Sequence, residues 1–373
     1  MRYSFDLKHH YRPKRGWMND PNGLVYFEGY YHAFYQHAPE HEQPWHEPMT
    51  WGHARTKDFL HWEELPVALR PDQPYDKGGC WSGTAIVHEG ILYLFYASIV
   101  REGGVAHQNV SVATSRDGIH FEKSPANPVI PSYPAEGSVD FRDPAVMRDG
   151  DTFYLVMASG NAESNAARLL LYESRDLLSW QYVGILYEWS GGFGADAVKM
   201  KYCECPSFMK YGDKYLLTAS VVEEGRHYFI ALYGAFDGKK FTPEVTGNVH
   251  CGPDQYAGQV FLDERGRHIM LTWVPGWSYS TFCERSLGCL SLPIELVVRD
   301  GKLYGVPLEE VRHLLEKQNP NVKRTENGFV IGRTLRENVV FEGEIRELAM
   351  LQDEYLMEVF VNGGEQIICA VLV

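Results

Sequence analysis

Apolar runs alternate with short polar turns along most of the chain, and five of these units share one form. Each is an apolar run, a polar turn with a glycine, and then an aromatic-rich run, which is the sequence form of two antiparallel strands. The five segments are residues 24–37, 83–98, 144–159, 206–221 and 258–274. The pattern therefore predicts five β-hairpins.

The turns of these hairpins recur at a nearly constant interval. Their glycines are Gly29, Gly90, Gly150, Gly212 and Gly266, so the steps are 61, 60, 62 and 54 residues. Such a period in strand-rich sequence is typical of a radial β architecture such as a propeller. We therefore predict an all-β fold, a five-bladed β-propeller.

A second motif repeats with the same period. An Asp followed four residues later by an aromatic residue begins at Asp58, Asp117, Asp176 and Asp237, with steps of 59, 59 and 61 residues. Asp between apolar runs favours a turn, because its side chain can accept hydrogen bonds from nearby backbone groups. The motif predicts a turn at the same place in four successive units.

The repeats end before the end of the chain, which predicts three parts. Residues 1–306 form the propeller, residues 307–317 a linker helix, and residues 318–373 a short β-strand appendage. The helix is expected because Pro307 suits a first turn, and Val311, Leu314 and Leu315 would share one face. A few strands cannot hide an apolar face alone, so the tail must pack on the propeller, on a partner subunit, or on both. A homo-oligomer sealed through the tail is one hypothesis.

Charge and composition exclude several classes of function. The net charge of -14 argues against nucleic acid and against anionic membrane surfaces, because both need clusters of Lys and Arg. No apolar run is long enough for a transmembrane helix, and the N-terminal residues lack an apolar signal core. Seven cysteines form no disulfide pattern, which favours a reducing, cytoplasmic location.

The candidate chemistry lies just before the hairpins, at one phase of the repeat. Three carboxylates, a Trp-Ser pair and a tyrosine occupy this phase: Asp20, Trp81 and Ser82, Asp143, Glu204, and Tyr256. If the repeats are equivalent in space, the carboxylates converge on one axis. Glycoside cleavage needs facing carboxylates, one as nucleophile or base and the other as acid. Each motif alone also has a purely structural interpretation, as a turn or an Arg-Asp pair.

Other side chains give weaker signals. Tryptophans near these positions, including Trp277, could offer flat faces to a sugar, although most are expected in the core. His37, His41, His46, His53 and His61 do not fall on one predicted element, and no Cys pair has zinc-finger spacing. We therefore predict no metal and no cofactor. Cys205 beside Glu204 is either an influence on its titration or an inert buried thiol.

Six motifs together resemble glycoside hydrolase family 32, which comprises invertases, sucrose-6-phosphate hydrolases, inulinases and levanases. They are WMNDPNG (17–23), FYQH (34–37), MTWGHA (49–54), WSG (81–83), FRDP (141–144) and ECP (204–206). The resemblance covers roughly residues 8–310. It implies a five-bladed propeller with a funnel-shaped site and a retaining β-fructofuranosidase that needs no cofactor.

The resemblance also implies a role for each motif residue. Asp20 resembles the nucleophile, Glu204 the general acid and base, and Asp143 the transition-state stabiliser. Arg142 should bind the same sugar and keep Asp143 ionised. The fructose-binding wall is expected to comprise Asn19, Gln36, Trp45, Trp81, Ser82, Arg142 and Trp273.

The chain departs from the family pattern after the propeller. The family normally adds a full β-sandwich, whereas only a short tail remains, so we expect a truncated sandwich. Residues 355–365 resemble a segment near the end of that sandwich.

The substrate and the class of activity stay open between several alternatives. Sucrose, sucrose 6-phosphate and short fructo-oligosaccharides are the favoured substrates. Phosphate recognition would need a cation such as Arg101, His107 or Lys199 at the rim of the site. The alternatives are a fructosyltransferase, a related glycosidase acting on arabinose or xylose, and a non-catalytic sugar-binding propeller.

Overall fold

The protein is all-β, as its sequence predicts. The computed structural model describes residues 6–41, 45–161, 166–189, 203–223, 226–250, 252–274 and 288–373. One 3-10 turn, η2 (Arg312–Leu314), is the only helical element with bounds in these ranges. No helix in the described part of the chain is long and apolar enough to cross a membrane.

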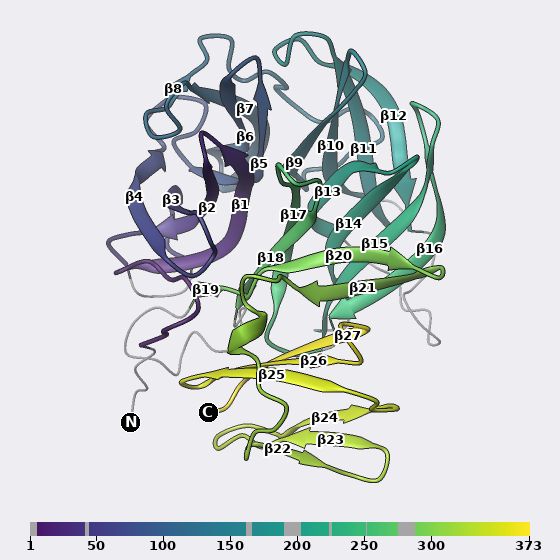
Figure 1. Ribbon diagram of the computed structural model, residues 1–373. Coiled ribbons are helices and arrows are strands. Elements are labelled where there is room, and N and C mark those ends of the chain that lie inside the picture. The colour runs from purple at the N-terminus through teal and green to yellow at the C-terminus, as the bar shows by residue number, and fades with distance from the viewer. Residues whose placement is uncertain are drawn as a thin grey trace.

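Five antiparallel sheets, each built from consecutive strands, follow one another along the chain (Figure 1). The first contains β1 (Trp17–Phe27), β2 (Tyr30–Ala38), β3 (Thr50–Thr56) and β4 (Trp62–Leu69). The second contains β5 (Gly79–His88), β6 (Ile91–Glu102), β7 (Val105–Ser115) and β8 (Glu122–Lys123). The third contains β9 (Phe141–Asp149), β10 (Thr152–Asn161), β11 (Ala166–Ser174) and β12 (Gln181–Glu188).

The last two sheets complete the main body. The fourth contains β13 (Cys203–Tyr211), β14 (Lys214–Glu223), β15 (Arg226–Phe236) and β16 (Phe241–His250). The fifth contains β17 (Tyr256–Leu262), β18 (His268–Val274), β20 (Ile294–Arg299) and β21 (Lys302–Pro307), with β19 (Cys289–Leu290) paired to β18. The first two strands of each sheet are the five predicted hairpins, which are thereby confirmed.

The repeated Asp motif makes the same turn four times, as predicted. Oδ1 of Asp58 accepts hydrogen bonds from the backbone N–H groups of Leu60 and His61, at 2.9 and 2.8 Å. At Asp117, Asp176 and Asp237, Oδ1 likewise accepts hydrogen bonds from the backbone N–H groups two and three residues further along the chain. Each turn joins the third and fourth strands of its sheet, where the side chain replaces backbone hydrogen bonds that a tight turn cannot make.

The first strands of the five sheets contact one another in a closed cycle. β1 touches β5, β5 touches β9, β9 touches β13, β13 touches β17, and β17 touches β1. Gln259 on β17 reinforces the closure, because its side chain accepts from the backbone N–H of Leu24 at 3.1 Å and donates to the carbonyl of Gly83 at 2.8 Å. Apolar side chains fill the space between neighbouring sheets, as Val156 and Leu169 do against Phe208 and Leu217.

The tail forms two layers below the main body (Figure 1). One comprises β22 (Val322–Arg324), β23 (Gly328–Ile331) and β24 (Val339–Glu342), and the other comprises β25 (Leu348–Asp353), β26 (Leu356–Val361) and β27 (Gln366–Val371). The layers share one apolar core, in which Phe329 and Ile331 meet Met357 and Ile368. A parallel pairing of His250 with Ile367 joins β27 to the fourth sheet, so the tail packs on the main body.

The predicted linker helix over residues 307–317 is wrong. Pro307 is the last residue of β21 and pairs with Ile294, and only the 3-10 turn η2 follows. Glu316 exchanges backbone hydrogen bonds with Met350 of β25, at 2.7 and 2.9 Å, which holds the chain extended. The apolar spacing that suggested a helix instead anchors this segment, because Val311 is buried in the core of the main body.

Candidate active site

The first strand of every sheet carries a β-bulge at the same place. We call this first strand the inner strand. In each bulge, two residues of the inner strand lie opposite a single residue of the second strand: residues 19–20, 81–82, 143–144, 205–206 and 257–258. Asp143, Cys205 and Ala257 have positive φ angles of 58, 49 and 53°, a conformation that L-residues rarely adopt. Bulges redirect side chains and concentrate near active sites, so five aligned bulges mark one functional site.

The carboxylates occupy three different positions relative to their bulges. Glu204 precedes its bulge, Asp143 is the first bulged residue, and Asp20 is the second. The expectation that all three share one phase therefore needs a correction. Hydrogen bonds between residues 62 positions apart agree with this alignment of the bulges. They run from Ser82 to Asp20, from Cys205 to Asp143, and from Arg142 to Glu204. A different position gives each carboxyl group a different set of neighbours.

Asp20 lies at the cavity wall with three hydrogen-bond donors around it. Ser82 Oγ donates to Oδ2 at 2.8 Å, Asn19 Nδ2 donates to Oδ1 at 3.2 Å, and Cys205 Sγ lies 3.6 Å from Oδ2. Burial raises the pKa of Asp20 to about 6, and the negative charge of Glu204 adds to the rise. These donors favour the carboxylate but do not offset the burial.

Asp143 is almost fully buried and lines the same cavity as Asp20. Its Oδ2 accepts a hydrogen bond from the backbone N–H of Cys205 at 2.9 Å, and Cys205 Sγ lies 3.7 Å away. Burial raises the pKa of Asp143 to about 7, although the charge of Arg142 acts in the opposite direction. Burial therefore opposes the attraction of Arg142, and the expectation that Arg142 keeps Asp143 ionised stays a prediction.

The thiol of Cys205 is buried between these two carboxyl groups. Burial raises its pKa well above the ordinary value, and the nearby carboxyl groups of Asp20 and Asp143 add to the rise. The geometry therefore favours the inert-thiol alternative, since a thiol that keeps its proton is a weak nucleophile.

Both carboxyl oxygens of Glu204 are held. Arg142 donates to Oε1 through Nη2 at 2.9 Å and through Nε at 3.2 Å. The hydroxyl of Tyr256 donates to Oε2. Nη1 of Arg142 donates to Oδ1 of Asp140 at 2.9 Å, so one guanidinium group bridges two carboxylates.

These groups line one cavity of about 390 Å³. Its described lining is Asn19, Asp20, Trp45, Trp81, Ser82, Gln108, Asp140, Arg142, Asp143, Glu204 and Tyr256. Trp45 and Trp81 meet edge to face, with ring centroids 5.3 Å apart. Carboxylates beside aromatic faces form a pocket suited to a sugar-sized molecule.

Two of the predicted wall residues lie behind this lining. Gln36 is buried and donates to the carbonyl of Cys80 at 3.0 Å. Trp273 is fully buried and packs edge to face on Trp17, which in turn donates to Asn19 at 3.1 Å. Lys199 and Trp277 lie outside the described residues.

The cavity also contains three residues that the sequence-based assignment of roles omitted. Tyr256 stands at the repeat phase in the fifth sheet, and this phase was the signal that could have identified it. Gln108 comes from β7 and Asp140 from the residue before β9, so neither falls on the repeated position.

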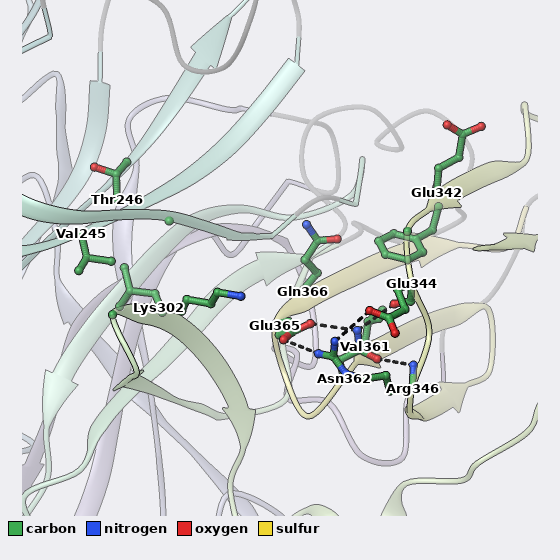
Figure 2. Close-up of a pocket in the computed structure, with 15 residues that line it drawn as sticks. Val245, Thr246, Lys302, Glu342, Glu344, Arg346, Val361, Asn362, Glu365 and Gln366 are labelled. Atoms are coloured by element: carbon green, nitrogen blue, oxygen red, sulfur yellow. Dashed lines mark hydrogen bonds and ion pairs between the residues drawn. The ribbon is translucent and has the colours of Figure 1, made fainter. Parts of the chain in front are cut away.

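A second cavity, of about 380 Å³, lies between the main body and the tail (Figure 2). Arg346 forms ion pairs with Glu344 and Glu365 there, and Lys302 and Glu342 also line the cavity. None of the three motif carboxylates Asp20, Asp143 and Glu204 lies in its lining. Within the described ranges, no group of three or more His, Cys, Asp or Glu side chains is placed to hold a metal ion.

The family model for the N-terminal domain of glycosyl hydrolases family 32 matches residues 10–307. This span includes all five inner strands and their bulges. The chain belongs to glycosyl hydrolases family 32. In this family 32 chain the site lies where the five inner strands meet. The motifs that contain Asp20, Asp143 and Glu204 lie on three of these strands.

Curated relatives agree with the family assignment. A sucrose-6-phosphate hydrolase from Escherichia coli is 36% identical over 340 residues, which is 86% of this chain and 69% of the relative. A raffinose invertase from the same organism is 35% identical over 328 residues, covering 83% and 66% of the two chains.

Solved structures of family 32 share the fold. A β-fructofuranosidase from Bombyx mori superposes with a TM-score of 0.82 at 24% identity, over 99% of this chain and 89% of that one. A sucrose-6-phosphate hydrolase from Lactobacillus gasseri gives a TM-score of 0.83 at 23% identity, over 99% and 88%.

Proposed function

We propose that the protein is a β-fructofuranosidase, which hydrolyses the bond to a terminal fructose in sucrose and related saccharides. The observation that carries this proposal is the cavity in which Asp20, Asp143 and Glu204 meet beside two tryptophans. Membership of family 32 and the names of its relatives support the same reaction. The closed cycle of inner strands supports a five-bladed propeller, and the two tail layers support a truncated sandwich.

In the proposed mechanism, Asp20 attacks the anomeric carbon of fructose and forms a covalent ester. Glu204 gives a proton to the leaving oxygen, and the bond from that oxygen to fructose breaks as the ester forms. Glu204 then removes a proton from water, which attacks the ester and frees Asp20. Two displacements at one carbon retain its configuration.

Asp143 is assigned to binding the fructose hydroxyls rather than to bond formation. Its buried position, with a hydrogen bond from the backbone N–H of Cys205, suits a fixed acceptor. Asn19, Ser82 and Arg142 complete the polar wall, while Trp45 and Trp81 present their faces to the sugar. Gln36 and Trp273 support this wall from behind.

The test is release of fructose by wild-type protein and by Asp20→Asn and Glu204→Gln. Each substitution should lower kcat by about a thousandfold or more, since each removes a group that forms or breaks a bond. Asp151→Asn, in an exposed turn, is the matched carboxylate control. Trapping a fructosyl ester on Asp20 by mass spectrometry would establish the covalent step. Near-normal turnover in either variant would overturn the assignment.

A fructosyltransferase on the same site is the second candidate function, because the ester on Asp20 could react with a sugar hydroxyl as well as with water. Product analysis at high sucrose concentration separates the two, since transfer yields trisaccharides and hydrolysis yields free fructose. Cytoplasmic location and assembly through the tail also remain proposals. The five cysteines in the described ranges are unpaired and buried, which is compatible with a reducing compartment.

A further inference from the structure

Negative charge dominates the described lining of the catalytic cavity. Asp20, Asp140, Asp143 and Glu204 contribute four carboxyl groups, whereas Arg142 is the one cationic side chain among the described lining residues. The raised pKa values of Asp20 and Asp143 are a consequence, in part, of the like charges that face them.

Arg142 has little capacity left for an incoming anion. It donates to Asp140 at 2.9 Å and to Glu204 at 2.9 and 3.2 Å, so its fork is already directed at two carboxylates. Its side chain is only 14% exposed. A guanidinium group binds phosphate best through two parallel hydrogen bonds, and here each of its three nitrogens already donates to a carboxylate.

Arg101 and His107, two further cations considered for phosphate binding, are absent from the described lining of the cavity, and Lys199 lies outside the described residues. Arg101 forms a two-pronged ion pair with Glu47, with Nε to Oε2 at 2.7 Å and Nη2 to Oε1 at 2.6 Å. His107 precedes Gln108 on β7, and successive strand residues point to opposite faces. Since Gln108 lines the cavity, His107 faces away from it.

We propose that this pocket selects uncharged saccharides over sugar phosphates, and that Asp140 is the rim residue that sets the preference. Asp140 is suited to this role because its side chain is 47% exposed, whereas that of Glu204 is 23% exposed. A sugar phosphate carries about -1.5 to -2 charges near neutral pH and would approach this carboxylate directly. The net charge of -14 of the whole chain opposes the same approach. This proposal rests on the proposed function and narrows the range of substrates that the enzyme would cleave.

The experiment compares kcat/KM for sucrose and sucrose 6-phosphate with the same protein preparation at pH 7.5. We expect a preference for sucrose of about a hundredfold. Raising the salt concentration should increase kcat/KM for the phosphate and leave that for sucrose nearly constant, because salt screens repulsion at an exposed carboxylate. Equal or faster cleavage of the phosphate would overturn the proposal.

Asp140→Asn tests the residue. The amide oxygen can still accept the hydrogen bond from Arg142, so the variant removes charge while keeping the bridge. The ratio of the two kcat/KM values should fall by about tenfold, whereas Asp151→Asn should leave the ratio unchanged. An unchanged ratio in Asp140→Asn would exclude Asp140 as the determinant.

The proposed hydrolase activity and the proposed selectivity for uncharged sugars can fail separately. Preferential cleavage of the phosphate leaves the proposed hydrolase intact and rejects only the selectivity. If neither sugar is cleaved, the hydrolase proposal fails, and calorimetric titration of the same protein with each sugar then decides the selectivity. Tighter binding of sucrose would support it, and tighter binding of the phosphate would overturn it.

Discussion

The hydroxyl of Tyr256 donates a hydrogen bond to Oε2 of Glu204, while Arg142 holds the other oxygen of the same carboxyl group. Tyr256 comes from the inner strand of the fifth sheet and Glu204 from that of the fourth. The contact therefore connects neighbouring sheets at the point where proton transfer is proposed.

Tyr256→Phe should lower kcat by about ten- to a hundredfold and change KM less, because the lost hydrogen bond orients a group that acts in the transition state. Phe retains the ring, which is 5% exposed, so the fold should survive. Steady-state kinetics over a range of pH would measure the effect. A purely structural role would leave the shape of the pH profile unchanged and lower only the yield of folded protein.

The pKa of Asp20, the proposed nucleophile, predicts how the activity changes at acid pH. Burial, followed by the charge of Glu204, raises the pKa of Asp20 to about 6, and only the ionised form can attack. The kcat/KM for sucrose should therefore fall about tenfold per pH unit below pH 6. Circular dichroism at each pH would control for unfolding. Full activity at pH 4.5 would contradict the assigned pKa.

Asp20→Asn should stabilise the fold at neutral pH while it abolishes activity. A carboxyl group with a raised pKa binds its proton more tightly in the folded chain than in the unfolded chain. The free energy of unfolding therefore decreases as the pH rises from about 4 to about 6 and stays lower above that range. The variant lacks this loss, so we expect its Tm to be about 2 °C or more higher at pH 7.5. The difference should vanish near pH 4, and a lower Tm at pH 7.5 would refute the argument.

A buried ion pair fixes the N-terminal segment to the tail. Asp353 accepts hydrogen bonds from the backbone N–H groups of Lys8, His9 and His10 and from Nδ1 of His10 at 2.8 Å. Asp353→Asn should cost up to about 3 kcal/mol, because it removes one of the two carboxylates that face the buried His10, Glu358 being the other. Urea denaturation at pH 7 would measure the loss. Glu354→Gln, at an exposed neighbouring position, should change stability by less than about 0.5 kcal/mol.

The same ion pair gives a second pH dependence, which has the same sign as that of Asp20 but lies at higher pH. Burial lowers the pKa of His10, but hydrogen bonds and charges from Asp353 and Glu358 outweigh it and raise the pKa to about 9. This contribution is fully present below pH 6.5 and is lost as the pH rises through about 9. The wild-type protein should therefore lose stability between about pH 6.5 and pH 9 more steeply than Asp353→Asn does. Parallel curves would contradict the assignment.

The sequence predicted those features that depend on neighbouring residues. Turn chemistry at Asp58 and its three equivalents is local, and so is the alternation that defines each hairpin, so both were readable from the sequence. The bulges were not, because a bulge is defined by the residue opposite it on the partner strand, and the bulges separate the positions of Asp20, Asp143 and Glu204. Gln108 and Asp140 were missed for a related reason, since neither follows the repeat.

The linker helix failed because its apolar residues are held by distant partners. Val311 packs into the core of the main body and Glu316 pairs with Met350, contacts that sequence spacing cannot reveal. Tertiary contacts of this kind commonly override the preference of a short segment.

The hydrogen bonds that Asp353 forms with Lys8 and its neighbours join residues 345 positions apart. The segment that leads into the proposed nucleophile strand is therefore secured only when the tail has folded back against it. Contacts of such long sequence separation form late and slow the folding of the whole domain. Removal of the strand that ends at Asp353 would therefore deprive the segment leading into β1 of its buried partner, far from the site that β1 helps to form.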